Sequence, residues 1–185
     1  YLYIDTNQQN EAIKIFQKYL ASGNTEHVAE IQIRLGYLYL ESSQQKKAIK
    51  IFEQYLASGA IDHSAAIQIR LAYLYVENKQ NFLAISLLEQ VRLLPDYQQN
   101  SEILQTLMVL YRDTVSKEKY VQFLLGVRSD ARLEEKERHG FQTQLILTYY
   151  EQKKCEKLLA ELKNKPGYLQ NSKNTNQEEW QHLLF

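Results

Sequence analysis

Apolar residues recur along the chain at the spacing of one helix face, in short segments separated by polar breaks. The pattern predicts one helix over 29–41, which ends at the polar break Ser42–Gln45. A second helix is predicted over 46–57, where Ser58-Gly59 stops it because glycine takes the left-handed conformation at little cost. The apolar positions of these two helices are Ile31, Leu35, Leu38 and Tyr39, and Ala48, Ile49, Phe52, Tyr55 and Leu56.

The two-helix pattern repeats with a period of 36 residues. Aligned without gaps, residues 1–36 and 37–72 agree at 22 of 36 positions, and the pentapeptide 31–35 returns unchanged at 67–71. One pair of helices cannot cover its own apolar stripe, so neighbouring pairs must stack on each other. The repeat therefore predicts an all-α solenoid of helix-turn-helix units.

The residues at the helix contacts resemble those of the tetratricopeptide repeat (TPR). The family's small residue in the first helix is matched by Gly36 and Ala72, and its small residue in the second helix by Ala48. The usual tryptophan is replaced by Gln32 and Gln68, and the unit is two residues longer than the family's 34. The resemblance implies a right-handed superhelix of about five helix-turn-helix units, the first of them incomplete.

The regularity of the repeat predicts how the chain is organised. Residues 1–95 form three TPR-like units, the first truncated, and 96–165 form two degenerate helical hairpins. We expect 166–185 to be a loop followed by a C-terminal capping segment. The helices expected in the degenerate part are Ser101–Asp113, Lys117–Val127, Arg132–Glu151 and Cys155–Lys165.

Composition narrows the class of partner. The 185 residues include 22 Lys+Arg and 22 Asp+Glu, so the formal charge is zero. This balance argues against a nucleic-acid binder, which normally carries a basic excess. We expect no membrane insertion, because no apolar run approaches the roughly 20 residues of a membrane helix. A single cysteine and the lack of Asn-x-Ser/Thr sequons favour a cytoplasmic location, and a start at Tyr1 instead of Met suggests a fragment of a larger protein.

Residues that could carry chemistry are sparse. Cys155 is the only thiol and stands among lysines, but no nucleophile signature surrounds it. His27 and His63 recur with the repeat before each first helix, which favours a packing or capping role over metal ligation. No Gly-rich phosphate loop and no histidine-based zinc motif occurs. We therefore expect a protein without enzymatic activity, cofactor or metal.

The first helix of each unit carries a second apolar stripe, roughly opposite Leu35. A helix that is apolar on two sides either lies between neighbours or exposes a binding surface, and we leave both interpretations open. In the TPR family these positions line a concave groove that receives peptides. The partner-binding residues predicted on this basis are Tyr1, Asp5, Arg34, Tyr37, Glu41, Arg70, Tyr73 and Glu77.

The function predicted from these observations is a protein-interaction scaffold that binds a partner peptide or helix in the groove, as part of a larger protein or assembly. Two alternatives stay open: a regulatory domain that senses a small peptide, and a substrate-docking arm of an enzyme whose catalytic domain is absent. The open ends of a solenoid also allow copies to associate head to tail.

Overall fold

The computed structural model describes residues 6–95, 100–131 and 133–163, and the regular secondary structure in these ranges is entirely helical. The chain divides into two compact units, Tyr1–Gln99 and Asn100–Phe185. We call them unit 1 and unit 2 and describe each by itself.

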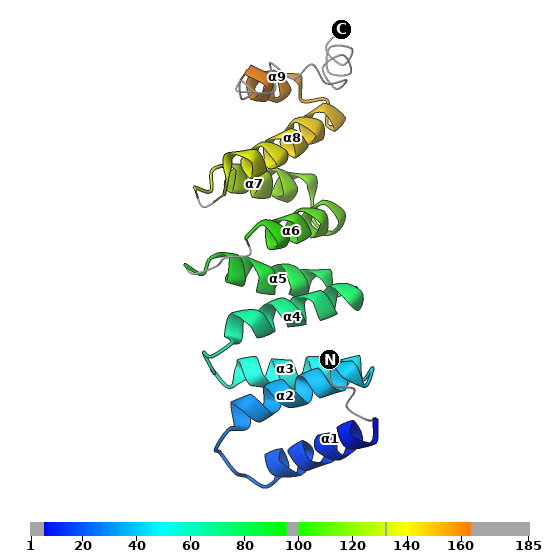
Figure 1. Ribbon diagram of the computed structural model, residues 1–185. Helices are drawn as coiled ribbons and strands as arrows, with labels where there is room; N and C mark the ends of the chain where they lie inside the picture. Colours follow the sequence, from blue (N-terminus) through cyan, green and yellow to red (C-terminus); the bar gives the residue numbers. More distant parts are fainter. Residues whose placement is uncertain (1–5, 96–99, 132, 164–185) are drawn as a thin grey trace. The chain divides into compact units, whose positions relative to one another are not determined.

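Unit 1 is built from helical hairpins, as the 36-residue period predicts (Figure 1). Its most extensive contacts join α2 to α3 and α4 to α5, and less extensive ones join α1 to α2 and α3 to α4. We call α2 and α4 first helices and α1, α3 and α5 second helices. The bounds are α1 (Thr6–Ala21), α2 (Val28–Glu41), α3 (Gln45–Ala57), α4 (Ser64–Glu77) and α5 (Asn81–Arg92).

The same tight turn closes both complete hairpins of unit 1. Its middle residue, Ser43 in one hairpin and Lys79 in the other, has a left-handed backbone with φ of 58° and 59°. The next residue donates its backbone N–H to the carbonyl five positions back and so satisfies a helix end that lacks an intrahelical partner. These pairs are Gln44 with Tyr39 at 2.7 Å and Gln80 with Tyr75 at 2.8 Å.

The loops between hairpins confirm one local prediction and correct another. Gly59 follows α3 with φ of 77°, the left-handed conformation that glycine was expected to supply. His27 and His63 stand at the N-caps of α2 and α4, but their side chains make no capping hydrogen bond. Both histidines instead adopt left-handed backbones, with φ of 54° and 62°. What the two histidines share is therefore a left-handed backbone that turns the loop into the next helix, and not a side-chain cap.

Each hairpin closes where a small residue of the first helix meets a large residue of the second. A Cβ atom added to Gly36 would lie 2.2 Å from Cε1 of Phe52, a ring that is completely buried. In the next hairpin, Ala72 and Leu88 stand 36 residues further on and are also completely buried. Ala72 is larger than Gly36, and Leu88 is smaller than Phe52. The two changes offset each other, which keeps the combined volume of the two side chains roughly constant.

Hydrogen bonds between tyrosine and the preceding second helix tie neighbouring hairpins together. The Gln17 amide of α1 donates to the hydroxyl of Tyr39 on α2 at 2.6 Å. One repeat later, the hydroxyl of Tyr75 on α4 donates to Glu53 Oε1 on α3, also at 2.6 Å. Burial, and then the hydrogen bond to the Glu53 carboxylate, raise the pKa of Tyr75 above the ordinary tyrosine value.

Unit 2 contains four helices in its described residues, and α7 and α8 make its most extensive contacts. We expect a helix from Arg132, but α8 begins later because Glu134 is its N-cap, with a backbone N–H 3.1 Å from the Glu137 carboxylate. The expected loop and cap over 166–185 lie outside the described residues. The bounds are α6 (Asn100–Thr114), α7 (Lys117–Arg128), α8 (Glu135–Glu151) and α9 (Cys155–Lys163).

A buried carboxylate joins three helices of unit 2. Glu161 on α9 is only 8% exposed, and its side chain pairs with the guanidinium of Arg128 on α7. Gln142 on α8 donates its side-chain amide to the Glu161 backbone carbonyl at 3.4 Å. The carboxylate requires the Arg128 guanidinium, because an unpaired buried charge is strongly destabilising, while the Gln142 bond satisfies the backbone carbonyl of the same residue.

The α8–α9 hairpin reproduces the design of α2–α3. Lys153 has a left-handed φ of 54°, and the next N–H, that of Lys154, donates to the carbonyl of Tyr149 at 3.0 Å. Lys157 places its ammonium 5.9 Å from the centre of the Tyr149 ring, much as Lys47 lies 5.5 Å from that of Tyr39. Tyr149 of α8 therefore corresponds in position to Tyr39 of α2.

The contact between Gly36 and Phe52 predicts a pair of substitutions that compensate each other. Gly36→Ala alone should lower the free energy of unfolding by about 1–3 kcal/mol, because the added methyl group has no space. Phe52→Leu alone should also destabilise, through a cavity beside Gly36. The double variant recreates the Ala72–Leu88 pair and should recover much of the loss in urea unfolding.

Gly126→Ala in α7 is the matched control, since no atom lies within 4 Å of the added Cβ atom. It should raise the free energy of unfolding by about 0.5–1 kcal/mol, the ordinary cost of glycine inside a helix. A Gly36→Ala protein as stable as the unmodified chain would contradict the close approach.

The buried Tyr75 phenol predicts a loss of stability in alkali. Its folded-state pKa is raised, so its contribution to stability is complete below about pH 10, where tyrosines of the unfolded chain ionise, and declines at higher pH. In Tyr75→Phe, the free energy of unfolding should fall less steeply above pH 10, and at neutral pH it should drop by about 1 kcal/mol through the lost hydrogen bond. Denaturant unfolding over a pH series measures both effects.

Candidate partner-binding surface

The two apolar stripes of the first helices in unit 1 differ in burial. Leu35 and Tyr39 on the core stripe of α2 are 1% and 5% exposed. The second stripe is only partly covered: Tyr37 is 38% exposed, and its other members are half-buried. We call the face that carries the second stripe the inner face. The second stripe consists of Ile33, Tyr37 and Leu40 on α2 and of Ile69, Tyr73 and Val76 on α4.

The predicted tyrosines are neither sealed in the core nor fully exposed. Tyr37 meets the ring of Phe52 edge to face, with ring centres 5.5 Å apart and planes at 69°, and the residue remains partly exposed to solvent. Tyr73 is half-buried. Tyr1 lies outside the described residues. Packing against Phe52 thus fixes the orientation of Tyr37 while leaving apolar area accessible.

The two predicted arginines differ in their surroundings although they occupy equivalent positions. Arg34 pairs with Glu30 one helical turn earlier, at 2.7 Å, on an exposed surface. Ala66 occupies the place of Glu30 in α4, and Arg70 is exposed. Arg70 makes no ion pair with another described residue, so it is the more accessible positive charge of the two.

The predicted acidic residues join neighbouring hairpins. Glu41, at the end of α2, accepts a hydrogen bond of 3.4 Å from the side-chain amide of Gln9 on α1. The side-chain amide of Gln45 on α3 donates in the same way to Glu77, at the end of α4. Asp5 lies outside the described residues. Both glutamates remain exposed, but part of their hydrogen-bonding capacity is already used within the fold.

A polar cavity of about 510 Å³ lies between the beginnings of α2 and α4. Ile33 and Arg34 line it on one helix, and His63 does so at the start of the other. Tyr55 reaches it from α3, where burial and the nearby Asp62 carboxylate raise the pKa of its phenol. One predicted partner-binding residue, Arg34, and one residue of the second stripe, Ile33, therefore border a hollow of mixed charge.

The acidic position at the end of the first helices also recurs in unit 2, which we did not predict. Tyr111 and Asp113 on α6 stand 36 residues after Tyr75 and Glu77. Glu151 follows Tyr149 by two positions, as Glu41 follows Tyr39. The unbroken 36-residue step was a usable signal for Asp113, whereas two extra residues before Tyr149 hide the step to Glu151.

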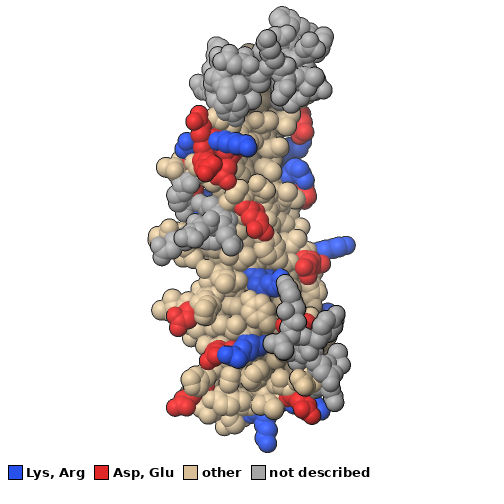
Figure 2. Space-filling view, viewed as in Figure 1, with Lys and Arg blue, Asp and Glu red and all other residues tan. Residues whose placement is uncertain are grey.

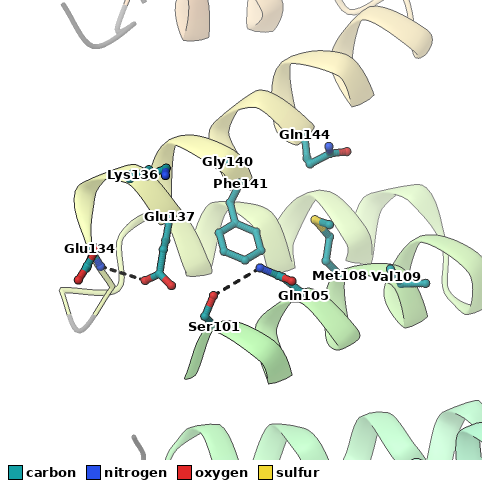
Figure 3. Close-up of a pocket in the computed structure, with 10 residues that line it drawn as sticks. All are labelled: Ser101, Gln105, Met108, Val109, Glu134, Lys136, Glu137, Gly140, Phe141 and Gln144. Carbon is teal, nitrogen blue, oxygen red and sulfur yellow. Dashed lines mark hydrogen bonds between the residues drawn. The ribbon is translucent and has the colours of Figure 1, made fainter. Parts of the chain in front are cut away.

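Unit 2 also contains a groove between α6 and α8, and we did not predict it. The groove has a volume of about 650 Å³. Phe141 points from α8 toward α6, and Met108 rises toward it from α6 (Figure 3). Gln105 of α6 donates to the Ser101 hydroxyl at 3.4 Å along the same wall. The lining residues are Ser101, Gln105, Met108 and Val109 from α6, and Glu134, Lys136, Glu137, Gly140, Phe141 and Gln144 from α8 and its N-cap.

The remaining candidates for chemistry are not brought together by the described residues. No group of three or more His, Cys, Asp and Glu side chains in this part of the chain is placed to hold a metal ion. Cys155 is an exposed free thiol at the start of α9. On the face drawn in Figure 2, acidic and basic side chains of the described residues are interspersed. None of the described helices combines the length and apolarity needed to cross a membrane.

No family model and no curated protein matches the sequence. Solved structures with a similar fold do match. A Podosopora anserina protein, described as a kinesin light chain of nearly identical TPR-like repeats, is 22% identical with a TM-score of 0.52 over 90% of each chain. MamA is 14% identical with a TM-score of 0.51 over 88% of this chain and 93% of MamA. BtubC (BKLC) from P. vanneervenii is 16% identical with a TM-score of 0.51 over 84% of this chain and 71% of its own.

At these identities the likeness concerns the fold alone. The chain has the all-α helical-repeat fold of TPR-like proteins, which confirms the resemblance found in the sequence.

Proposed function

We propose that this chain is a protein-interaction module that binds a segment of a partner protein along the inner faces of its first helices. The proposal rests on one observation: the second stripe of α2 and α4 stays partly exposed although the core stripe of the same helices is buried. Apolar and aromatic area that packing leaves accessible on successive helices suits an extended or helical partner segment.

The tyrosines are the residues best suited to supply binding energy. Tyrosine combines a broad apolar ring with a polar hydroxyl and loses little side-chain entropy, so it is frequent among residues that dominate interfaces. Tyr37 is already oriented by its contact with Phe52, which reduces the entropy lost on binding. Tyr73 occupies the same position one repeat later, and Tyr1 completes the series in the proposal.

The charged residues contribute unequally to the proposed surface. Arg70 is exposed and keeps its charge available to orient an acidic group of the partner, while Glu30 already neutralises Arg34. Glu41 and Glu77 support the surface mainly by holding neighbouring hairpins together through Gln9 and Gln45. Asp5 would act at the equivalent place in the truncated first repeat.

The proposal predicts that removing both tyrosine rings abolishes binding without unfolding the protein. Proteins captured from the native host by the full-length protein are compared by quantitative mass spectrometry with those captured by Tyr37→Ala/Tyr73→Ala. Specific partners should be lost with the double variant, because truncating such residues commonly costs about tenfold or more in affinity each. Thermal melting checks that both proteins are folded.

Phe82→Ala is the matched control, because Phe82 is an exposed aromatic residue on the second helix α5. It should retain the partners that the tyrosine variant loses. Retention of all partners by Tyr37→Ala/Tyr73→Ala, or equal loss with Phe82→Ala, would contradict the assignment to the inner face.

A further inference from the structure

The groove between α6 and α8 has the features of a specific subsite. We propose that it receives a large apolar side chain of an extended partner segment, with a lysine or arginine next to that side chain. The proposal rests on the interaction function proposed above and adds to it a second site, in unit 2, with a defined ligand chemistry. It involves none of the residues of the second stripe in unit 1.

Gly140 is the first argument for a ligand. It stands inside α8, where glycine costs about 0.5–1 kcal/mol relative to alanine. No atom lies within 4 Å of a Cβ atom added there, and its φ is not in the left-handed range, so neither packing nor backbone geometry requires glycine. The correspondence of Tyr149 with Tyr39 places Gly140 at the position of Glu30, which in α2 carries the ion pair to Arg34. Because Gly140 has no side chain, the groove stays open at the position where α2 carries the ion pair between Glu30 and Arg34.

The walls of the groove match an extended segment. Met108 and Phe141 provide an apolar floor, and Val109 beside them is 42% exposed. Methionine adapts its shape to different apolar groups, which suits a pocket for one large side chain. The amides of Gln105 on α6 and Gln144 on α8 face the groove from its two sides, where each can bond the backbone of an extended strand.

The charge at the rim of the groove favours a basic residue next to the apolar side chain of the partner segment. Two carboxylates, those of Glu134 and Glu137, stand against one ammonium, that of Lys136. Glu137 uses Oε2 to accept the Glu134 backbone N–H, which leaves its other oxygen available to a cation. Gln144 occupies the position that Arg34 holds in α2, so the inner face of α8 lacks the arginine found in unit 1. A positive group on the partner therefore complements this rim.

The probe for this proposal is a displayed library of random short peptides, selected on the full chain. Peptides that carry Leu, Met or Phe next to Lys or Arg should be enriched over those selected on an unrelated helical protein. Individual enriched peptides are then labelled and titrated against variants. Gly140→Leu fills the groove without a clash at its Cβ atom, so it should weaken their binding by about tenfold or more without lowering the melting temperature.

Gly126→Leu in α7 is the matched control, because it also adds a leucine to an open helical position but lies outside the groove lining. It should leave peptide affinity unchanged. The double substitution Glu134→Gln/Glu137→Gln should weaken the binding of the basic peptides and reduce the dependence of their affinity on salt.

Three results would overturn the proposal: no enrichment, enrichment of acidic sequences, or binding that Gly140→Leu leaves intact. A test of the same peptides on Tyr37→Ala/Tyr73→Ala separates this failure from failure of the general function. Peptides that lose binding with the tyrosine variant but not with Gly140→Leu would refute the groove in unit 2 and support the inner face of unit 1.

Discussion

The close packing of a first helix on its second helix is the constraint on which the rest of the structure depends. At Gly36 the first helix comes so near to Phe52 that only a hydrogen atom fits between them, and the next hairpin reaches a similar volume with Ala72 and Leu88. This contact fixes how each hairpin is folded. The orientation of Tyr37, which rests on the same phenylalanine ring, follows from it. The proposed binding surface thus rests in part on the phenylalanine ring that closes the hairpin.

The bonds between hairpins show why the polar residues of the repeat have two roles. Tyr39 and Tyr75 bury their rings in the core, and their hydroxyls reach back to the preceding second helix. Glu41 and Glu77 do the same from the ends of the first helices while remaining exposed. These residues recur because every junction needs the same ties. Recurrence in a repeat protein therefore indicates a shared structural need at least as readily as a shared ligand.

The two units differ in what their first helices leave open. In unit 1 the hollow between α2 and α4 is bordered by an ion pair, a carboxylate and histidines, and the exposed apolar area lies along the second stripe. In unit 2 the hollow between α6 and α8 has an apolar floor, because Met108 and Phe141 line it and Gly140 adds no side chain. The same architecture thus offers an extended stripe in one unit and a discrete pocket in the other.

The sequence by itself determined the helices and the 36-residue period, because these follow from the spacing of apolar positions. The TPR-like fold and the close approach at Gly36 were implied by the resemblance of the residues at the helix contacts to those of the TPR family. The sequence also placed Tyr37 and Tyr73 on the second stripe of the first helices and Arg70 along one side of that stripe. Only the tertiary structure decided how much of the second stripe is covered and that Glu41 and Glu77 are bound by glutamines of other helices. The pairing of Arg34 with Glu30 lies within one helix, so its four-residue spacing was a usable sequence signal. The tertiary structure alone revealed the groove beside Gly140, since a hollow is formed by residues far apart in the chain. Helical periodicity is a local property, whereas exposure and the hydrogen bonds between helices depend on which neighbours the packing of separate helices brings together.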